Sequence, residues 1–195
     1  MLLVIYLTIC YNYVGDIMRV ISGKYKGKNL EGYNIIGTRP TMDRVKESLF
    51  GTIQNYVKNS ISLDLFAGSG GLGIETLSNG GKMCYFVDNG KQIKKILQDN
   101  LKGIEGAIYL DLDYRKALEE LKKQEIKFDI VFLDPPYHEH LINNAIKLIQ
   151  EYNLLNLNGI IICEYIDENI DDYGYQLLKT KKYGDKYINI YKYVN

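Results

Sequence analysis

The strongest chemical signal in the chain is the sequence Asp134-Pro135-Pro136-Tyr137, which follows an apolar run (129–133) that predicts a buried strand. Two prolines stiffen the turn and fix the carbonyls around it. The Asp134 carboxylate and the Pro135 carbonyl can both accept hydrogen bonds from one planar NH2 group, while the Tyr137 ring can lie against an aromatic ring. This set fits an exocyclic amine on a nucleobase, whose nitrogen becomes more nucleophilic when two acceptors hold its hydrogens. The alternative is a rigid turn with a surface tyrosine.

A second signal is the glycine pattern G-x-G-x-x-G formed by Gly68, Gly70 and Gly73, which lies between a predicted strand and a predicted helix. Glycines let the backbone of a loop approach a ligand closely. Asp88 lies 20 residues after Gly68, at the end of the next predicted strand, where a carboxylate can accept hydrogen bonds from ribose hydroxyls. The pattern therefore predicts binding of an adenosine group, carried by either a dinucleotide or S-adenosylmethionine.

Two further carboxylates bear on the identity of that ligand. Asp64, just before the glycines, suits a cationic ligand with an amino group and a sulfonium, and it would repel a pyrophosphate. Its alternative role is to cap the backbone of the loop. Asp113, after the third predicted strand, is placed to accept from an adenine amino group, and Asp111 competes with it for that role. The alternative for Asp113 is the N-cap of the following helix.

The elements that must position these residues alternate regularly between residues 61 and 164. Short apolar runs predict strands at 61–66, 83–87, 108–110, 128–133 and 159–163. Helical patterns separate them at about 71–79, 91–102, 114–123 and 138–151. This alternation is typical of βαβ units and a buried parallel sheet, in which ligands bind beyond the carboxyl ends of the strands. Residues 175–182 and 187–194 alternate apolar and polar side chains around Gly184-Asp185, which predicts a hairpin that closes the sheet with antiparallel pairing.

The composition excludes several classes of protein. With 195 residues, 46% hydrophobic and 25% charged, the chain is neither disordered nor a multi-span membrane protein. Lys+Arg and Asp+Glu are 24 each, so nucleic acid is not bound through overall charge. The charge is uneven, however: residues 18–58 carry eight basic and three acidic side chains, a net of +5. The three cysteines form no Cys-x-x-Cys and His138-x-His140 has no third ligand pattern, so we expect a reducing compartment and no metal.

Three segments are expected along the chain. Residues 1–17 are too short and too polar for a membrane span and lack the basic start of a secretion signal. We expect Met18 to be the natural start and residues 1–17 to be a non-native or disordered extension, with an extra strand or a membrane-surface segment as alternatives. Residues 18–58 are expected to form a β-extension and a helix at 41–57, and residues 59–195 the catalytic domain.

The glycine loop together with Asp134 to Tyr137 resembles S-adenosylmethionine-dependent amino-methyltransferases that act on adenine N6, guanine N2 or glutamine amides. Two flanking segments, MRVISGKYKGKNL (18–30) and TRPTMDRVKESLF (38–50), resemble the bacterial RsmD-type family of 16S ribosomal RNA guanine-N2 methyltransferases. The likeness extends from Met18 to the C-terminus. It implies an α/β, Rossmann-like class I methyltransferase fold with a mostly parallel seven-stranded sheet, an antiparallel last strand and a small N-terminal β-extension.

The resemblance also implies roles for individual residues. The cofactor S-adenosylmethionine would contact Asp64, Phe66, Ala67, Gly68, Ser69, Gly70, Asp88 and Asp113. The catalytic set that holds the target guanine would be Asp134, Pro135, Pro136 and Tyr137. The RNA would contact Arg19, Lys24, Arg39 and Arg44. The family often has Glu at position 88 and can have Phe at position 137, and both differences keep the chemistry.

The expected substrate is small-subunit ribosomal RNA or a partly assembled small ribosomal subunit, modified in the cytoplasm by a monomer that contacts no membrane and holds no metal. One alternative is an amino-methyltransferase acting on adenine N6 of DNA or RNA, although a DNA enzyme of this kind usually carries a separate target-recognition region. The other is an NAD-dependent oxidoreductase or a non-catalytic adenosine-binding module, against which Asp64 and the proline turn argue.

Overall fold

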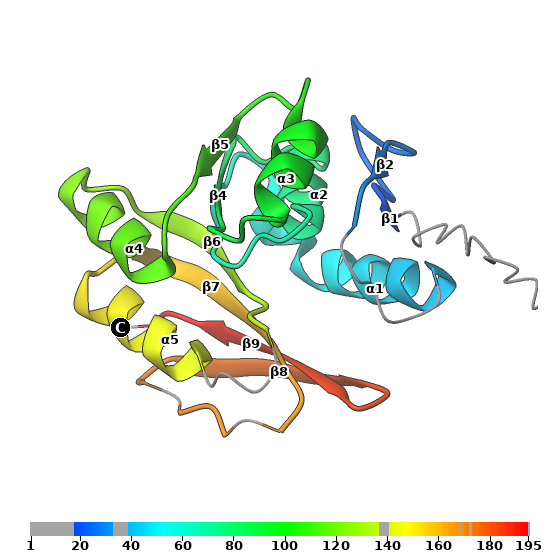
Figure 1. Ribbon diagram of the computed structural model, residues 1–195. Helices are drawn as coiled ribbons and strands as arrows, with labels where there is room; N and C mark the ends of the chain where they lie inside the picture. Colours follow the sequence, from blue (N-terminus) through cyan, green and yellow to red (C-terminus); the bar gives the residue numbers. More distant parts are fainter. Residues whose placement is uncertain (1–17, 33–38, 137–140, 168, 172, 195) are drawn as a thin grey trace, which may run out of the picture.

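The computed structural model describes residues 18–32, 39–136, 141–167, 169–171 and 173–194 (Figure 1). Its centre is a seven-stranded sheet made of β3 (Ile61–Asp64), β4 (Met83–Val87), β5 (Ala107–Leu110), β6 (Phe128–Leu133), β7 (Leu155–Tyr165), β8 (Gln176–Tyr183) and β9 (Lys186–Lys192). The strand order is β5-β4-β3-β6-β7-β9-β8. The first five strands in this order pair in parallel, and β9 runs antiparallel to both of its neighbours. The predicted fold class is confirmed.

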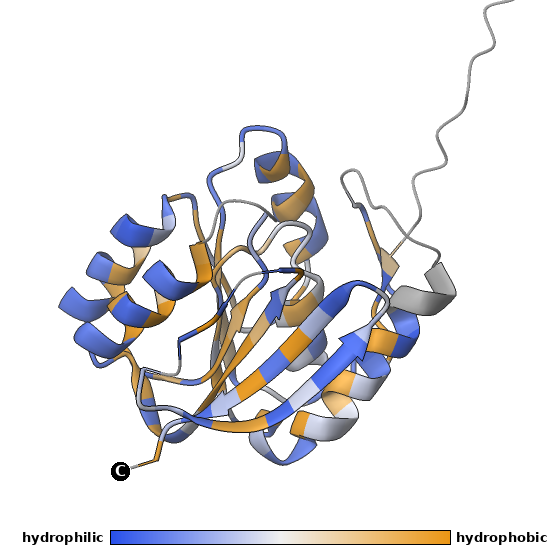
Figure 2. Cartoon of the chain, turned by 90° about the horizontal axis from the view of Figure 1, so that it is seen from below, coloured by the Kyte–Doolittle hydropathy of each residue, from blue (hydrophilic) through white to orange (hydrophobic). Residues whose placement is uncertain are grey.

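In the part of the chain that the structure describes, the two faces of this sheet are covered by the helices α1 (Arg39–Val57), α2 (Gly71–Ser78), α3 (Ile93–Leu101), α4 (Tyr114–Lys123) and α5 (Leu141–Glu151). Helices α4 and α5 pack on one face, through buried residues such as Leu118 and Ile146. Helices α1, α2 and α3 pack on the other face, through residues such as Ile53, Ile74 and Leu97. Figure 2 shows the result: the central strands are mainly apolar and the outer sides of the helices are mainly polar. The sheet is therefore buried on both faces, as a parallel sheet requires.

The predicted elements differ from the observed ones mainly at their ends. Strand β7 begins at Leu155, four residues before the predicted start, because the buried Leu155 pairs with Phe128. A register shift separates that pair from the next one, Ile130 with Ile160. The residues between them on β7 include Asn156 and Asn158, which interrupt the apolar run in the sequence. An irregularity in the pairing thus concealed the first part of the strand.

The N-terminal extension is a small separate sheet of β1 (Met18–Arg19) and β2 (Asn29–Leu30), which pair antiparallel. It packs against α2, with Val20 and Leu30 buried between them. Gly23 makes this contact possible, because a Cβ there would lie 1.8 Å from the Ser78 carbonyl oxygen. The predicted β-extension is therefore present.

Two statements on organisation remain predictions. The division of the chain at residues 58 and 59 is one of them, and the interpretation of residues 1–17, which lie outside the described part, is the other. Within the described part, none of the helices combines the length and the apolar character that crossing a membrane requires.

Candidate active site

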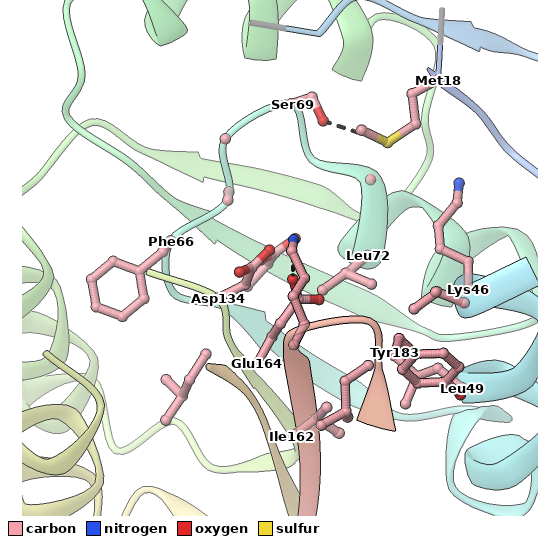
Figure 3. A pocket seen from close by; sticks show the side chains of 18 of the residues that line it. Met18, Lys46, Leu49, Phe66, Ser69, Leu72, Asp134, Ile162, Glu164 and Tyr183 are labelled. Carbon is pink, nitrogen blue, oxygen red and sulfur yellow. Dashed lines mark hydrogen bonds and ion pairs between the residues drawn. The ribbon is translucent and has the colours of Figure 1, made fainter. Parts of the chain in front are cut away.

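A cavity of about 470 Å³ opens beyond the carboxyl ends of β3, β6 and β7 (Figure 3). This edge is where parallel α/β sheets bind ligands. Most of its wall comes from five places, which are β1, α1, the glycine loop, the ends of β6 and β7, and the β8–β9 turn. The residues that the arguments below use are Met18, Lys46, Asp64, Phe66, Ala67, Gly68, Ser69, Asp134, Glu164 and Lys186.

The glycines of the loop serve three different purposes. Gly68 lines the cavity with a φ of +51°, and a Cβ there would meet nothing within 4 Å. Gly70 is not among the lining residues; it has a φ of +82°, and a Cβ there would lie 2.9 Å from Leu97. Gly73 lets α2 approach the sheet, since its Cβ would lie 2.3 Å from a ring carbon of Phe86. Of these three glycines of the motif, Gly68 alone lines the cavity and leaves backbone open to a ligand in the way the motif predicts.

The carboxyl of Asp64 lies under the loop, with only 2% of its surface exposed, and it lines the cavity. It accepts a hydrogen bond of 3.0 Å from the Gly73 N–H, so the capping role is geometrically present. Burial raises the pKa of Asp64 to about 7; the Gly73 hydrogen bond opposes this and the charge of Asp88 adds to it. A cation in the cavity would favour the ionised form of this carboxyl.

The carboxylates of Asp88 and Asp113 accept hydrogen bonds from backbone N–H groups and are not among the residues that line the cavity. Asp88 accepts from the N–H groups of Gly68 at 2.9 Å and Gly90 at 2.8 Å, and so it fixes the glycine loop. A carboxylate has about four lone-pair sites, so two bonds leave acceptor capacity for a ribose. Asp113 is the N-cap of α4 and accepts from the Arg115 N–H at 3.0 Å, which is the alternative role considered for it.

Three side chains between Asp64 and Gly70 also line the cavity, namely Phe66, Ala67 and Ser69. The Phe66 ring lies against the ring of Tyr114, with 5.3 Å between their centroids. The Ser69 hydroxyl points toward the sulfur of Met18 at 3.8 Å, which brings the extension to the rim of the cavity (Figure 3). The loop thus presents both an aromatic face and a polar group to a ligand.

Asp134 follows β6 directly and lines the cavity opposite the glycine loop (Figure 3). Burial raises the pKa of Asp134, the neighbouring Glu164 carboxylate raises it further, and the Lys186 ammonium lowers it. Pro135 is buried and Pro136 is exposed. Tyr137 and the two histidines after it lie outside the described residues, so the expected stacking role of Tyr137 remains a prediction.

Two functional candidates were missed by reasoning from the sequence. Glu164 stands near the carboxyl end of β7 and Lys186 begins β9, and both line the cavity beside Asp134. The Glu164 Oε1 and the Lys186 Nζ lie 2.6 Å apart. The position of Glu164 after an apolar run is the signal that could have identified it, since the same rule had identified Asp88.

A third missed residue is Lys46 of α1, which lines the cavity although its surface is only 7% exposed. Its Nζ donates to the Arg19 carbonyl and lies 3.6 Å from Glu75 of α2, a carboxylate with no exposed surface. Burial lowers the pKa of Lys46, and the Glu75 charge opposes that shift. Lys46 therefore connects α1, the extension and α2 at one point.

The four basic residues expected to contact RNA lie on the extension and α1. The Arg19 guanidinium pairs with Asp43 at 3.0 Å, and the Lys24 ammonium pairs with Glu105 at 2.8 Å. Arg44 is exposed on α1, and Arg39 is the first residue of that helix. Their contact with RNA remains a prediction.

The strand order, the antiparallel β9 and the cavity beside the glycine loop define a Rossmann-like class I methyltransferase. Comparison with known families places the chain further. Residues 18–192 match the family described as Conserved hypothetical protein 95, and the chain belongs to this family, the RsmD-type family that its motifs resemble.

Individual relatives agree with this assignment. The chain is 41% identical to "Putative rRNA methyltransferase YlbH" of Bacillus subtilis, over 90% of this chain and 98% of that protein. It is 38% identical to "Ribosomal RNA small subunit methyltransferase D" of Haemophilus influenzae, over 86% of this chain and 89% of that protein. Among solved structures, "putative methylase HI0767" from Haemophilus influenzae is 34% identical, with a TM-score of 0.75 over 92% of this chain and 99% of that one.

Proposed function

We propose that this protein transfers a methyl group from S-adenosylmethionine to the exocyclic N2 amine of a guanine in small-subunit (16S) ribosomal RNA. The observation that carries the proposal is that the glycine loop and Asp134 line one cavity. Relatives named as small-subunit ribosomal RNA methyltransferases support the class of substrate. A guanine rather than an adenine follows from the likeness to the RsmD-type family.

S-adenosylmethionine is the cofactor, and it supplies an electrophilic methyl group on a sulfonium. The residues present fit it. Gly68 and Ser69 offer backbone and hydroxyl to the cavity, and Asp64 offers a carboxylate to a positive charge. Asp88 would accept from the ribose hydroxyls and Asp113 from the adenine edge, each with the lone pairs that its backbone contacts leave.

The part of this chain in the reaction is to hold and activate the amine. Asp134 accepts hydrogen bonds from the N2 hydrogens, which draws the nitrogen lone pair out of the ring and offsets the positive charge that develops on nitrogen. A carbon–nitrogen bond forms while the carbon–sulfur bond breaks, and S-adenosylhomocysteine leaves. The nitrogen then releases one proton to Asp134 or to solvent. A raised pKa makes the ionised Asp134 a better base than an exposed aspartate, which suits it to take this proton.

The extension and α1 would hold the RNA. Eight basic and three acidic side chains in residues 18–58 give a local positive charge that can contact phosphates. The overall charge is zero, so RNA shape and ribosomal proteins would add to recognition, as in a partly assembled subunit. Such a substrate also places the enzyme, which we propose to be a monomer, in the cytoplasm.

The test is the variant Asp134→Ala with small-subunit rRNA from a strain that lacks the gene. Mass mapping of the nucleosides should show one N2-methylguanosine restored by the wild-type protein and none by the variant. Affinity for S-adenosylmethionine should stay within a few-fold, because Asp134 does not hold the cofactor. Methylation by the variant at the wild-type rate would refute the role of Asp134, and methyladenosine as the product would favour the adenine alternative.

A further inference from the structure

The ion pair of Glu164 and Lys186 lies beside the residue that holds the amine. Leu133 pairs with Cys163 across β6 and β7, so Asp134 and Glu164 follow as neighbours at the same edge of the sheet. Strand β9 is the next strand in the sheet and begins at Lys186, which reaches Glu164 at 2.6 Å. Three adjacent strands therefore bring a carboxylate, a second carboxylate and an ammonium together at the wall of one cavity.

This set matches the Watson–Crick edge of guanine. That edge presents the N2 amine, then the N1–H, then the O6 carbonyl, which is two donors followed by one acceptor. An enzyme that modifies a base outside its stack reads it through this edge. The order of groups across the strands is acceptor, acceptor and donor, because an ionised carboxylate only accepts and an ammonium only donates.

We propose that Glu164 and Lys186 select guanine: Glu164 accepts from the N1–H and Lys186 donates to O6 while Asp134 holds the N2 amine. The inference rests on the proposed function, since it assumes that Asp134 holds an amine. Adenine with its amine at Asp134 would turn an unprotonated N1 toward the Glu164 carboxylate, and two acceptors would face each other. The cavity would therefore reject adenine by repulsion as well as by a lost hydrogen bond.

The charges around Glu164 support this assignment. The electrostatic neighbours of Asp134 are Glu164, Asp64 and Lys186. The ammonium of Lys186 offsets part of the negative charge of the three carboxyls. The pair with Lys186 at 2.6 Å also fixes the position of the Glu164 carboxylate at the wall of the cavity.

The test uses 2-aminopurine, which has the exocyclic amine at C2 but no N1–H and no O6. Small subunits are reconstituted with 16S rRNA that carries guanine or 2-aminopurine at the mapped target. The variant Glu164→Gln should lower kcat/KM on guanine by about 10- to 100-fold, the usual value of a specific base contact. On 2-aminopurine it should leave kcat/KM unchanged or raise it, because no N1–H contact is lost there and the glutamine amide can donate to the unprotonated N1 that a carboxylate repels.

Controls separate this result from a general defect. Glu119→Gln removes a carboxylate from an exposed ion pair on α4 and should leave both substrates unchanged. Lys186→Met serves if Glu164→Gln does not fold, and it should also affect guanine more than 2-aminopurine. Equal losses on the two substrates would overturn the inference and leave the proposed function intact. A wild-type protein that methylates adenine and no guanine would overturn both.

Discussion

The variant Glu75→Ala should release the N-terminal extension from the methyltransferase domain. Glu75 lies in α2, has no exposed surface, and accepts hydrogen bonds from the extension rather than from solvent. Its carboxylate takes the N–H of Ile21 at 2.9 Å, the N–H of Ser22 at 2.8 Å and the Ser22 hydroxyl at 2.8 Å. The Nζ of Lys46 lies 3.6 Å from the Oε2 of the same carboxylate. Alanine would therefore leave two backbone donors without their acceptor, and it would remove the carboxylate that faces the Lys46 ammonium, which keeps its bond to the Arg19 carbonyl.

The expected loss of stability follows from the free energy that each of these buried interactions contributes. Removing one partner of a buried ion pair costs about 3–5 kcal/mol. Each buried backbone donor left without an acceptor costs about 1–3 kcal/mol, although undocking of the extension would return those donors to water. We therefore expect a loss of about 3–5 kcal/mol for Glu75→Ala. Glu75→Gln keeps an acceptor oxygen and loses the charge, so we expect it to lower the free energy of unfolding by about 1–3 kcal/mol.

Two measurements together test this prediction. Urea denaturation followed by circular dichroism gives the free energy of unfolding, and trypsin cleavage after Lys24, Lys26 or Lys28 reports undocking of the extension. Cleavage should accelerate in Glu75→Ala more than the global stability alone explains. Glu119→Ala, which breaks the exposed pair with Lys123 at 3.0 Å, should leave both measurements unchanged. A loss below about 1 kcal/mol with unchanged cleavage would show that Glu75 does not anchor the extension.

Three further predictions concern the cavity. Binding of S-adenosylmethionine at pH 6 should release up to one proton, because burial raises the pKa of Asp64 to about 7 and a bound cation favours the carboxylate. Titration calorimetry in two buffers of different ionisation enthalpy measures the protons released. The variant Asp64→Asn should release none. Gly73→Ala should lower the free energy of unfolding, measured by urea denaturation, by about 1–3 kcal/mol, because its Cβ would lie 2.3 Å from the Phe86 ring. Gly68→Ala should instead mainly weaken the binding of the cofactor. The single-turnover rate should rise with pH through the raised pKa of Asp134 and level off above it, since only the carboxylate accepts from the amine; a flat profile in the wild-type protein would contradict that.

The parts of the fold that the sequence predicts are those set by local patterns. Apolar runs separated by helical stretches predict a parallel sheet, and its carboxyl edge then collects Asp64, Asp88 and Asp134 without any knowledge of contacts. The hairpin around Gly184 was predicted in the same way. Strand ends were less predictable, because the start of β7 depends on its irregular pairing with Phe128.

The missed residues depend on contacts between distant segments. Glu164 and Lys186 are 22 residues apart and meet because β9 returns antiparallel beside β7. Glu75 looks like an exposed residue of a helix, yet the extension covers it completely. No periodicity in the sequence distinguishes such a glutamate from a solvated one. A pairing partner can be identified only when the packing of the extension is known.

The packing of the extension bears directly on catalysis. Lys46 lines the cavity while its ammonium binds the Arg19 carbonyl and faces Glu75. One buried cluster thus holds the extension, α1 and the helix that follows the glycine loop in a fixed relation. If the extension binds RNA phosphates, this cluster sets the distance between the RNA backbone and the methyl donor. A loosened extension should therefore lower the rate of the chemical step as well as the affinity for RNA, because a misplaced base no longer meets the donor in line.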